Sequence, residues 1–345
     1  MNILFTCAGR RNYLINYFKE ALNGKGSVVA VDMQLSAPAL VDADVAKKVP
    51  SIYDKNYISA IEKVITEEKI DAVISLNDLE LPILAKNKEQ LEKSGARILI
   101  SSQNVIDICF DKWKSYHFFK ENSIKTPLTY INIASAKEAL KNNELHFPLV
   151  VKPRWGSASI SIDIVKSVEE LELSYKLQHL KVSRSILGTV SSSDAENCIM
   201  IQEKLNGEEY GIDILNNFDG EYYGSFVRKK LGMRSGETDK AISIVNQKYN
   251  MVAEKIAKAT KHVGNMDCDF FVVDGEVYFL EMNPRFGGGY PFSHEAGVNT
   301  PAIYLAWLEN ESNYDQYNKF RSGLAFSKCD RILQIPKEAI PNHMD

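Results

Sequence analysis

The sequence predicts an α/β protein that begins with a parallel-sheet lobe and continues into regions with antiparallel strands. In roughly the first hundred residues, short continuous apolar runs alternate with helical segments, which is typical of a buried parallel sheet. Beyond Asp107, alternating apolar and polar runs joined by tight turns indicate hairpins. With 345 residues, the chain is longer than a single compact core usually holds, so two or three lobes are expected.

Composition and charge exclude several classes of protein. The hydrophobic content of 45% and the charged content of 25% are ordinary for a globular chain. A formal net charge of -4 argues against nucleic acid or an anionic membrane as the main partner. No apolar run is long enough to span a membrane, and the N-terminal apolar run is too short for a signal peptide. The 5 cysteines are scattered, without metal-type spacing, so we expect free thiols and a cytoplasmic location.

In the first lobe, strands are expected at 2–6, 28–32, 72–76 and 97–100, with helices at 13–22, 58–68 and 81–93. Ligands of such lobes collect at the carboxyl ends of the strands. These ends carry the substrate candidates Arg10, Arg11, Asp78 and Glu80. A dinucleotide site is not expected, because the first turn has one glycine instead of a Gly-x-Gly-x-x-Gly pattern.

The next region suggests a site for a polyphosphate. A strand over 147–153 ends in a lysine, Lys152, and a loop of small residues over 154–159 leads to a return strand over 160–165. Such a loop beside a lysine can offer backbone N–H groups and positive charge to phosphates, although it is not a Walker A loop. A helix near 168–177 then precedes the polar stretch 188–194, which we expect to be a mobile or inserted loop.

Further along, a strand over 198–205 turns at Asn206-Gly207 into an antiparallel partner over 208–215. Another strand follows over 221–227. The stretch 232–238 has two glycines amid charges, which is typical of an active-site loop, and it contains the substrate candidate Arg234. A helix over 250–263 is expected to cover the sheet.

The stretch 279–289 is the strongest candidate for a reaction centre. Glu281 and Asn283 lie two apart on an apolar run that predicts a strand, so they share one face. Their carboxylate and amide oxygens suit a hard cation such as Mg²⁺. Pro284 ends the strand, Arg285 adds a fixed positive charge, and three glycines follow.

Whether Asp269 joins this site depends on the register of the hairpin around Asp274-Gly275. A two-residue loop would place Asp269 on the face opposite Glu281, because side chains alternate along a strand. A three-residue loop with a left-handed Gly275 would bring the two acids together with Asn283. We expect the three-residue loop.

Taken in order, these motifs resemble the ATP-grasp superfamily, and within it the branch similar to carbamoyl phosphate synthase. The most specific likeness is the stretch from 264–269 through 281–285. The resemblance implies a Rossmann-like pre-ATP-grasp domain over 1–106. It implies an ATP-grasp domain of two α+β subdomains over 107–310, divided into 107–200 with the lid and 201–310 with the metal site. The tail over 311–345 matches nothing in the family.

The resemblance also implies roles for individual residues. The metal ligands would be Asp269, Glu281 and Asn283, and Arg285 would contact the reacting phosphoryl or acyl group. The resemblance assigns ATP phosphates to Lys112 and Lys152 and to the flexible loop with Gly156, Ser157 and Ser159. It assigns adenine to the hinge with Glu203, Lys204 and Leu205, and ribose to Glu209. The cofactors implied are ATP and Mg²⁺ or Mn²⁺.

The family's chemistry agrees with these residue types, because phosphorylating a carboxylate needs positioning and charge neutralisation rather than a protein nucleophile. We therefore expect an ADP-forming ligase that joins a small carboxylate to an amine, with Lys152 and Arg285 in the reaction. The alternatives are a carbamate-type kinase, whose product is the acyl phosphate, and an ATP-binding sensor without turnover. The oligomeric state stays open, a homodimer being one option.

Overall fold

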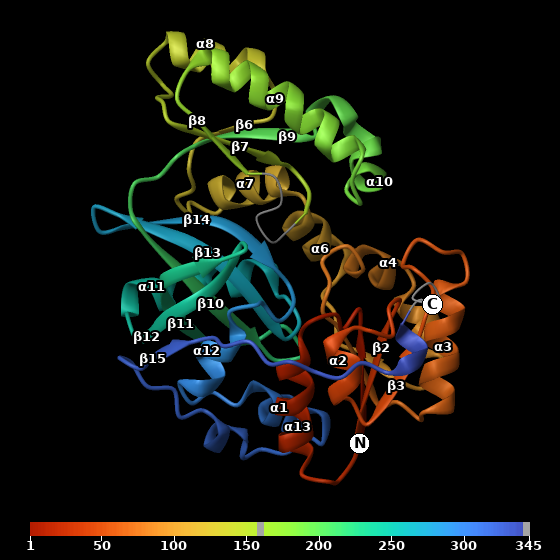
Figure 1. Cartoon of the computed structure of the whole chain (residues 1–345). Helices are drawn as coiled ribbons and strands as arrows, with labels where there is room; N and C mark the ends of the chain where they lie inside the picture. The colour runs from red at the N-terminus through yellow and green to blue at the C-terminus, as the bar shows by residue number, and fades with distance from the viewer. Residues whose placement is uncertain (157–161, 341–345) are drawn as a thin grey trace.

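The computed structural model describes residues 1–156 and 162–340, and within this part of the chain the strands form three sheets. Figure 1 shows the sheet of the first lobe beside a central sheet, with the third sheet and its helices at the far end. The expected Ser157 and Ser159 contacts lie outside the described residues.

The first lobe is a parallel sheet in the order β3-β2-β1-β4-β5. The expected strands are present, and the sequence pattern missed β3, whose residues alternate between half-buried and exposed. The strands are β1 (Asn2–Thr6), β2 (Ser27–Asp32), β3 (Val45–Lys48), β4 (Ala72–Ser75) and β5 (Arg97–Ile98). The helices are α1 (Asn12–Leu22), α2 (Pro38–Asp42), α3 (Tyr57–Glu67), α4 (Leu81–Lys86), α5 (Lys88–Glu92) and α6 (Gln103–Phe110).

The second sheet, here called the lid sheet, is antiparallel and has the order β6-β9-β7-β8. The expected domain boundary at 200/201 falls inside its strand β9. The expected loop over 188–194 is wrong, because these residues form α10 and a 3-10 turn, η1. The strands are β6 (Thr129–Tyr130), β7 (Leu149–Pro153), β8 (Asp163–Val165) and β9 (Ile199–Glu203). Nearby helical segments are α7 (Lys112–Glu121), α8 (Ile133–Lys141), α9 (Val168–Ser183), α10 (Gly188–Ser191) and η1 (Ser192–Asn197).

The central sheet has the order β14-β13-β10-β11-β12-β15 and is covered by α11 (Gln247–Thr260). The prediction of an irregular loop over 232–238 is wrong, because these residues form the end of a β11–β12 hairpin. Its turn is Ser235-Gly236, with φ of 50° and 80°. The strands are β10 (Glu208–Asn216), β11 (Tyr222–Arg234), β12 (Glu237–Ile244), β13 (Asn265–Val273), β14 (Glu276–Asn283) and β15 (Ala325–Ser327).

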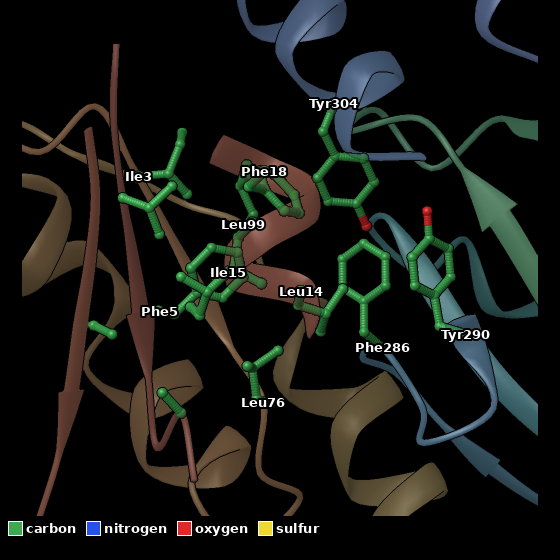
Figure 2. Close-up of a cluster of buried hydrophobic side chains, with 14 of the residues drawn as sticks. Ile3, Phe5, Leu14, Ile15, Phe18, Leu76, Leu99, Phe286, Tyr290 and Tyr304 are labelled. Carbon is green, nitrogen blue, oxygen red and sulfur yellow. The ribbon is translucent and has the colours of Figure 1, made fainter. Parts of the chain in front are cut away.

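The first lobe and the central sheet share one hydrophobic core. Phe18 of α1 packs edge-on against Phe286, which follows β14, and against Tyr304 of α13 (Thr300–Leu308), as Figure 2 shows. Tyr290 of α12 (Tyr290–Glu295) belongs to the same cluster. Burial of such aromatic rings contributes strongly to cohesion, so these two parts form one packed unit.

The C-terminal segment, for which the resemblance gave no counterpart over 311–345, joins the central sheet. This segment contains two 3-10 turns, η2 (Tyr314–Tyr317) and η3 (Lys337–Ala339), and between them strand β15, which pairs with β12. Figure 1 shows this segment running from the central sheet to the first lobe, where Arg331 forms an ion pair of 2.6 Å with Asp42. In the described part of the chain, the helices include none long and apolar enough to cross a membrane.

Candidate functional site

A cavity of about 660 Å³, here called the large cavity, lies between the lid sheet and the central sheet. Its size falls within the range of small-molecule sites. The residues expected to contact ATP gather on its wall: Lys112, Lys152, Gly156, Glu203, Lys204, Leu205 and Glu209. They come from both sheets and from the start of α7, so folding brings together segments that are far apart in the sequence.

Two lysines supply positive charge to the large cavity. Lys152 on β7 is buried, and its Nζ donates a hydrogen bond of 2.9 Å to Oε1 of Gln202. Burial is the main cause that lowers the pKa of Lys152 to about 8; the charge of Lys112 acts in the same direction, and the attraction of Glu281 and Asp269 opposes it. Lys112 contacts the carbonyl oxygen of Gly156, and its Nζ lies 3.6 Å from Oε2 of Glu281.

Local structure explains why Lys112 lies at the wall of the large cavity. It is the first residue of α7, and the Asp111 side chain caps this helix by accepting from the N–H groups of Trp113 and Lys114. Arg154 holds Asp111 through two hydrogen bonds of 2.7 Å. The lysine is therefore anchored to the strand end that carries Lys152.

The hinge residues lie where β9 of the lid sheet ends and the chain passes to β10 of the central sheet. Oε2 of Glu203 accepts a hydrogen bond of 3.2 Å from the backbone N–H of Leu128. Glu209 forms an ion pair of 2.7 Å with Lys230, whose Nζ also lies 2.8 Å from Oδ1 of Asp269. Lys230, which the sequence analysis did not select, therefore links the cavity wall to the acidic hairpin.

The hairpin of β13 and β14 brings Asp269 and Glu281 into direct register, but the expected three-residue loop is wrong. The loop has two residues, Asp274 and Gly275, with φ of 50° and 78°, as in a tight hairpin turn. A bulge lies instead at Leu280, because Phe270 pairs with Phe279 while Asp269 pairs with Glu281. This extra residue reverses the alternation of side chains, so the acids meet as expected for a different reason.

Electrostatics make this acidic pair receptive to a cation. Burial raises the pKa of Asp269 to about 6, with Asp267 and Glu281 adding to the rise while Lys230 opposes it. Burial also acts to raise the pKa of Glu281, but Lys112 and Lys152 outweigh this effect and hold it below the usual value. In the described residues, no three His, Cys, Asp or Glu side chains cluster as metal ligands. A metal ion here would therefore need Asn283 as well as the two carboxylates.

A second hollow of about 100 Å³, here called the polar pocket, adjoins the large cavity. Both are lined by Glu209, Met233, Gly236, Asp269 and Glu281. Asn283 and Arg285 line the polar pocket, so all the expected metal ligands face it. The acidic hairpin thus stands where the two spaces meet.

A buried chain of alternating charges supports this pocket, and the sequence analysis missed most of it. Nη1 of Arg228 lies 2.6 Å from Oδ2 of Asp213, and its Nη2 contacts Asp267. Arg285 lies 3.7 Å from Asp267 and 2.6 Å from Asp78. Asp267 carries one signal in the sequence, because it lies two residues before Asp269 and so on the same face.

The substrate candidates separate into different environments. Arg11 lines the polar pocket, and Asp78 is engaged by Arg285. Glu80 is fully buried and accepts hydrogen bonds from the hydroxyls of Thr6, Ser75 and Tyr57, which makes it an interior residue that lines neither hollow. The remaining two, Arg10 and Arg234, also line neither. Arg10 is exposed, and Arg234 forms an ion pair with Asp330.

Comparisons with known proteins agree with this architecture. Residues 3–99 match the model of the PylC-like N-terminal domain, and residues 195–332 match the model described as ATP-grasp in the biosynthetic pathway with Ter operon. The first lobe is therefore similar to a PylC-like N-terminal domain, and the region that holds most of the central sheet is similar to an ATP-grasp domain.

Curated relatives are distant and mostly much longer. The carbamoyl phosphate synthase large chain of Thermoanaerobacter sp. (strain X514) is 28% identical over 229 residues, covering 63% of this chain and 20% of the relative. This chain thus spans about a fifth of such relatives. The formate-dependent phosphoribosylglycinamide formyltransferase of Prochlorococcus marinus is 27% identical over 281 residues, covering 79% of this chain and 65% of the relative.

Solved structures share the fold. N5-carboxyaminoimidazole ribonucleotide synthetase in complex with ADP has a TM-score of 0.68 at 17% identity, covering 90% of this chain and 77% of that one. The biotin carboxylase domain of Hydrogenobacter thermophilus 2-oxoglutarate carboxylase, with MgADP and bicarbonate, has a TM-score of 0.72 at 16% identity, covering 92% and 72%.

Proposed function

We propose that this chain is an ATP-dependent, ADP-forming ligase that joins a carboxylate to an amine through an acyl phosphate. The observation that carries this proposal is the junction of the large cavity and the polar pocket at Asp269 and Glu281. A nucleotide in the first space and a carboxylate in the second would meet where the acids and Arg285 lie. The two similar structures named above hold ADP, and residues 195–332 of this chain match an ATP-grasp model.

The residues present fit the implied cofactors. The large cavity has two lysines for phosphates, and Asp269, Glu281 and Asn283 offer only oxygen ligands, which Mg²⁺ prefers. ATP would supply the phosphoryl group and Mg²⁺ would neutralise its charge. Lys112 and Lys152 would hold the phosphates in line with the substrate, as positioning is the main requirement for phosphoryl transfer.

Bond changes would proceed in two steps. A carboxylate oxygen of the substrate attacks the γ-phosphorus, and the bond to the bridging oxygen breaks to release ADP. The amine then attacks the acyl carbon, loses a proton, and expels phosphate, which retains the carboxylate oxygen. The guanidinium of Arg285, fixed by Asp78 at 2.6 Å, would stabilise the negative charge that builds up in both steps.

The test is carboxylate-dependent release of ADP by the full chain with Mg-ATP. Hydroxylamine can replace the unknown amine, because it converts acyl phosphates into stable hydroxamates. Arg285→Ala should slow the reaction by roughly a hundredfold or more, on the scale of losing one electrostatic stabiliser, with ATP binding preserved. A stable acyl phosphate that accumulates in the presence of amines would favour the kinase. ATP binding without carboxylate-stimulated turnover would favour the sensor.

A further inference from the structure

We propose that two copies of the chain form a two-fold dimer in which helix α9 of one copy packs antiparallel against α9 of the other. The interface would lie on the outer side of the lid sheet, and the proposal is independent of the proposed ligase function. It depends on three features of α9: an exposed row of leucines, the charges at its two ends, and its position outside both hollows.

Helix α9 is apolar on two opposite faces. One face, with Leu171 and Val182, is buried in the hydrophobic cluster of the lid sheet. The other face carries Leu173, Leu177 and Leu180, which are 63%, 48% and 50% exposed. Their i, i+4, i+7 spacing places them along one side of the helix, and they are here called the leucine row. A surface helix normally presents polar residues on its outer face, so the leucine row indicates an interaction surface.

The charges beside the leucine row differ between the two ends of α9. Glu169 and Glu170 lie in the first turn, Lys181 lies in the last turn, and Arg184 caps the C-terminal end. All four side chains are exposed, and none forms an ion pair with another described residue. This distribution also suits the dipole of the helix, but the dipole does not account for the exposed leucines between the charged ends.

A second copy in the antiparallel orientation complements both the apolar and the charged parts of this surface. In a two-fold pair the same surface serves both copies, so Leu173 of one copy meets Leu180 of the other, with Leu177 near the axis. The acidic start of each helix then lies beside the basic end of the other helix. A parallel pair would instead set Glu169 against Glu169 and Arg184 against Arg184, so the charges favour the antiparallel arrangement.

Both hollows stay open in such a dimer. Figure 1 shows α8 and α9 on the side of the lid sheet away from the central sheet, and among the described residues those of α9 line neither the large cavity nor the polar pocket. A helix of 16 residues is about 24 Å long, and a single pair of such helices buries an area at the low end for specific interfaces. We therefore expect a reversible dimer with a dissociation constant in roughly the micromolar range.

The test is sedimentation velocity of the full chain over a concentration series that reaches roughly 100 μM. We expect a shift from monomer to dimer along this series. Leu177→Glu places like charges near the two-fold axis and should keep the chain monomeric throughout. The matched control is Met251→Glu, at an apolar residue of α11 that is 63% exposed and lies outside the proposed interface, and this variant should dimerise like the unmodified chain. A chain that stays monomeric over the whole series, or that dimerises equally well with Leu177→Glu, overturns the inference.

Charge reversal at low ionic strength tests the direction of the pair. Glu169→Lys with Glu170→Lys should weaken the dimer by roughly tenfold, and so should Lys181→Glu with Arg184→Glu. Combining all four reversals should restore dimerisation, because each acidic end again meets a basic end. Each reversal also opposes the helix dipole, so an effect on helix stability alone would be greatest in the fourfold variant. A fourfold variant that dimerises more weakly than both double variants, or double variants that dimerise like the unmodified chain, would contradict the antiparallel pair.

Discussion

The buried ion pair of Asp213 and Arg228 gives a sharp prediction for Asp213→Asn. Asp213 is fully buried and Arg228 is only 2% exposed, with 2.6 Å between them. Ser293 and Asn265 also donate to Asp213, at 2.6 and 3.0 Å. Removing one partner of a buried pair costs about 3–5 kcal/mol. Because Asp267 still faces Arg228, we expect the lower end, about 3 kcal/mol.

The assay is thermal unfolding of the full chain. At about 2–4 °C per kcal/mol, the midpoint of Asp213→Asn should fall by several degrees. The matched control is Glu276→Gln on the exposed side of the β13–β14 hairpin, where the glutamate pairs with Lys125 and Lys248 at 3.0 Å each. Exposed pairs contribute little, so this midpoint should barely move. Equal shifts for the two variants would refute the reasoning from burial.

Three further predictions concern the cavity and the pocket. Lys152 has a pKa of about 8, so its protonated form, to which we assign the ATP phosphates, is lost as pH rises through that value. KM for ATP should therefore rise above pH 8, and Lys152→Arg should remove this pH dependence in steady-state kinetics. Glu281→Gln should abolish turnover while the unfolding midpoint stays within a few degrees, because we assign the carboxylate to a metal ion. Retained turnover would contradict this assignment. A Cβ at Gly289 would lie 2.2 Å from Nε of Arg228, so Gly289→Ala should displace that arginine and lower the unfolding midpoint. Gly232→Ala is the milder control, because a Cβ there would come no closer than 3.8 Å to its neighbours.

The sequence predicted the elements better than the contacts between them. The strands of the first lobe follow from continuous apolar runs, and the pairing of Asp269 with Glu281 was expected. The bulge at Leu280 that produces this pairing was not expected, because no glycine or other local signal marks it in the sequence. The turn at Asp274-Gly275 has the residues of a tight hairpin, and this local signal correctly indicates the two-residue loop that the structure has.

Tertiary pairing accounts for what the sequence analysis missed. Asp213, Arg228 and Asp267 stand on three different strands, β10, β11 and β13, so no spacing along the chain shows that they meet. Strand β15 gains its conformation from pairing with β12 across a long separation, and its own residues carry no strong strand pattern. The glycines of 232–238 suggested an irregular loop, whereas one of them, Gly236, occupies the left-handed position of a turn.

The contact between Asp78 and Arg285 has a consequence for motion within the molecule. It ties the first lobe to the end of β14, and the shared aromatic core fixes the same two parts together. The lid sheet has its own hydrophobic cluster, which includes Leu149, Leu171 and Ile199, and from the first lobe Leu79 and Phe110 pack against it. In the ligase proposed above, spent nucleotide would leave by a movement of the lid sheet, while Arg285 keeps its place against the first lobe.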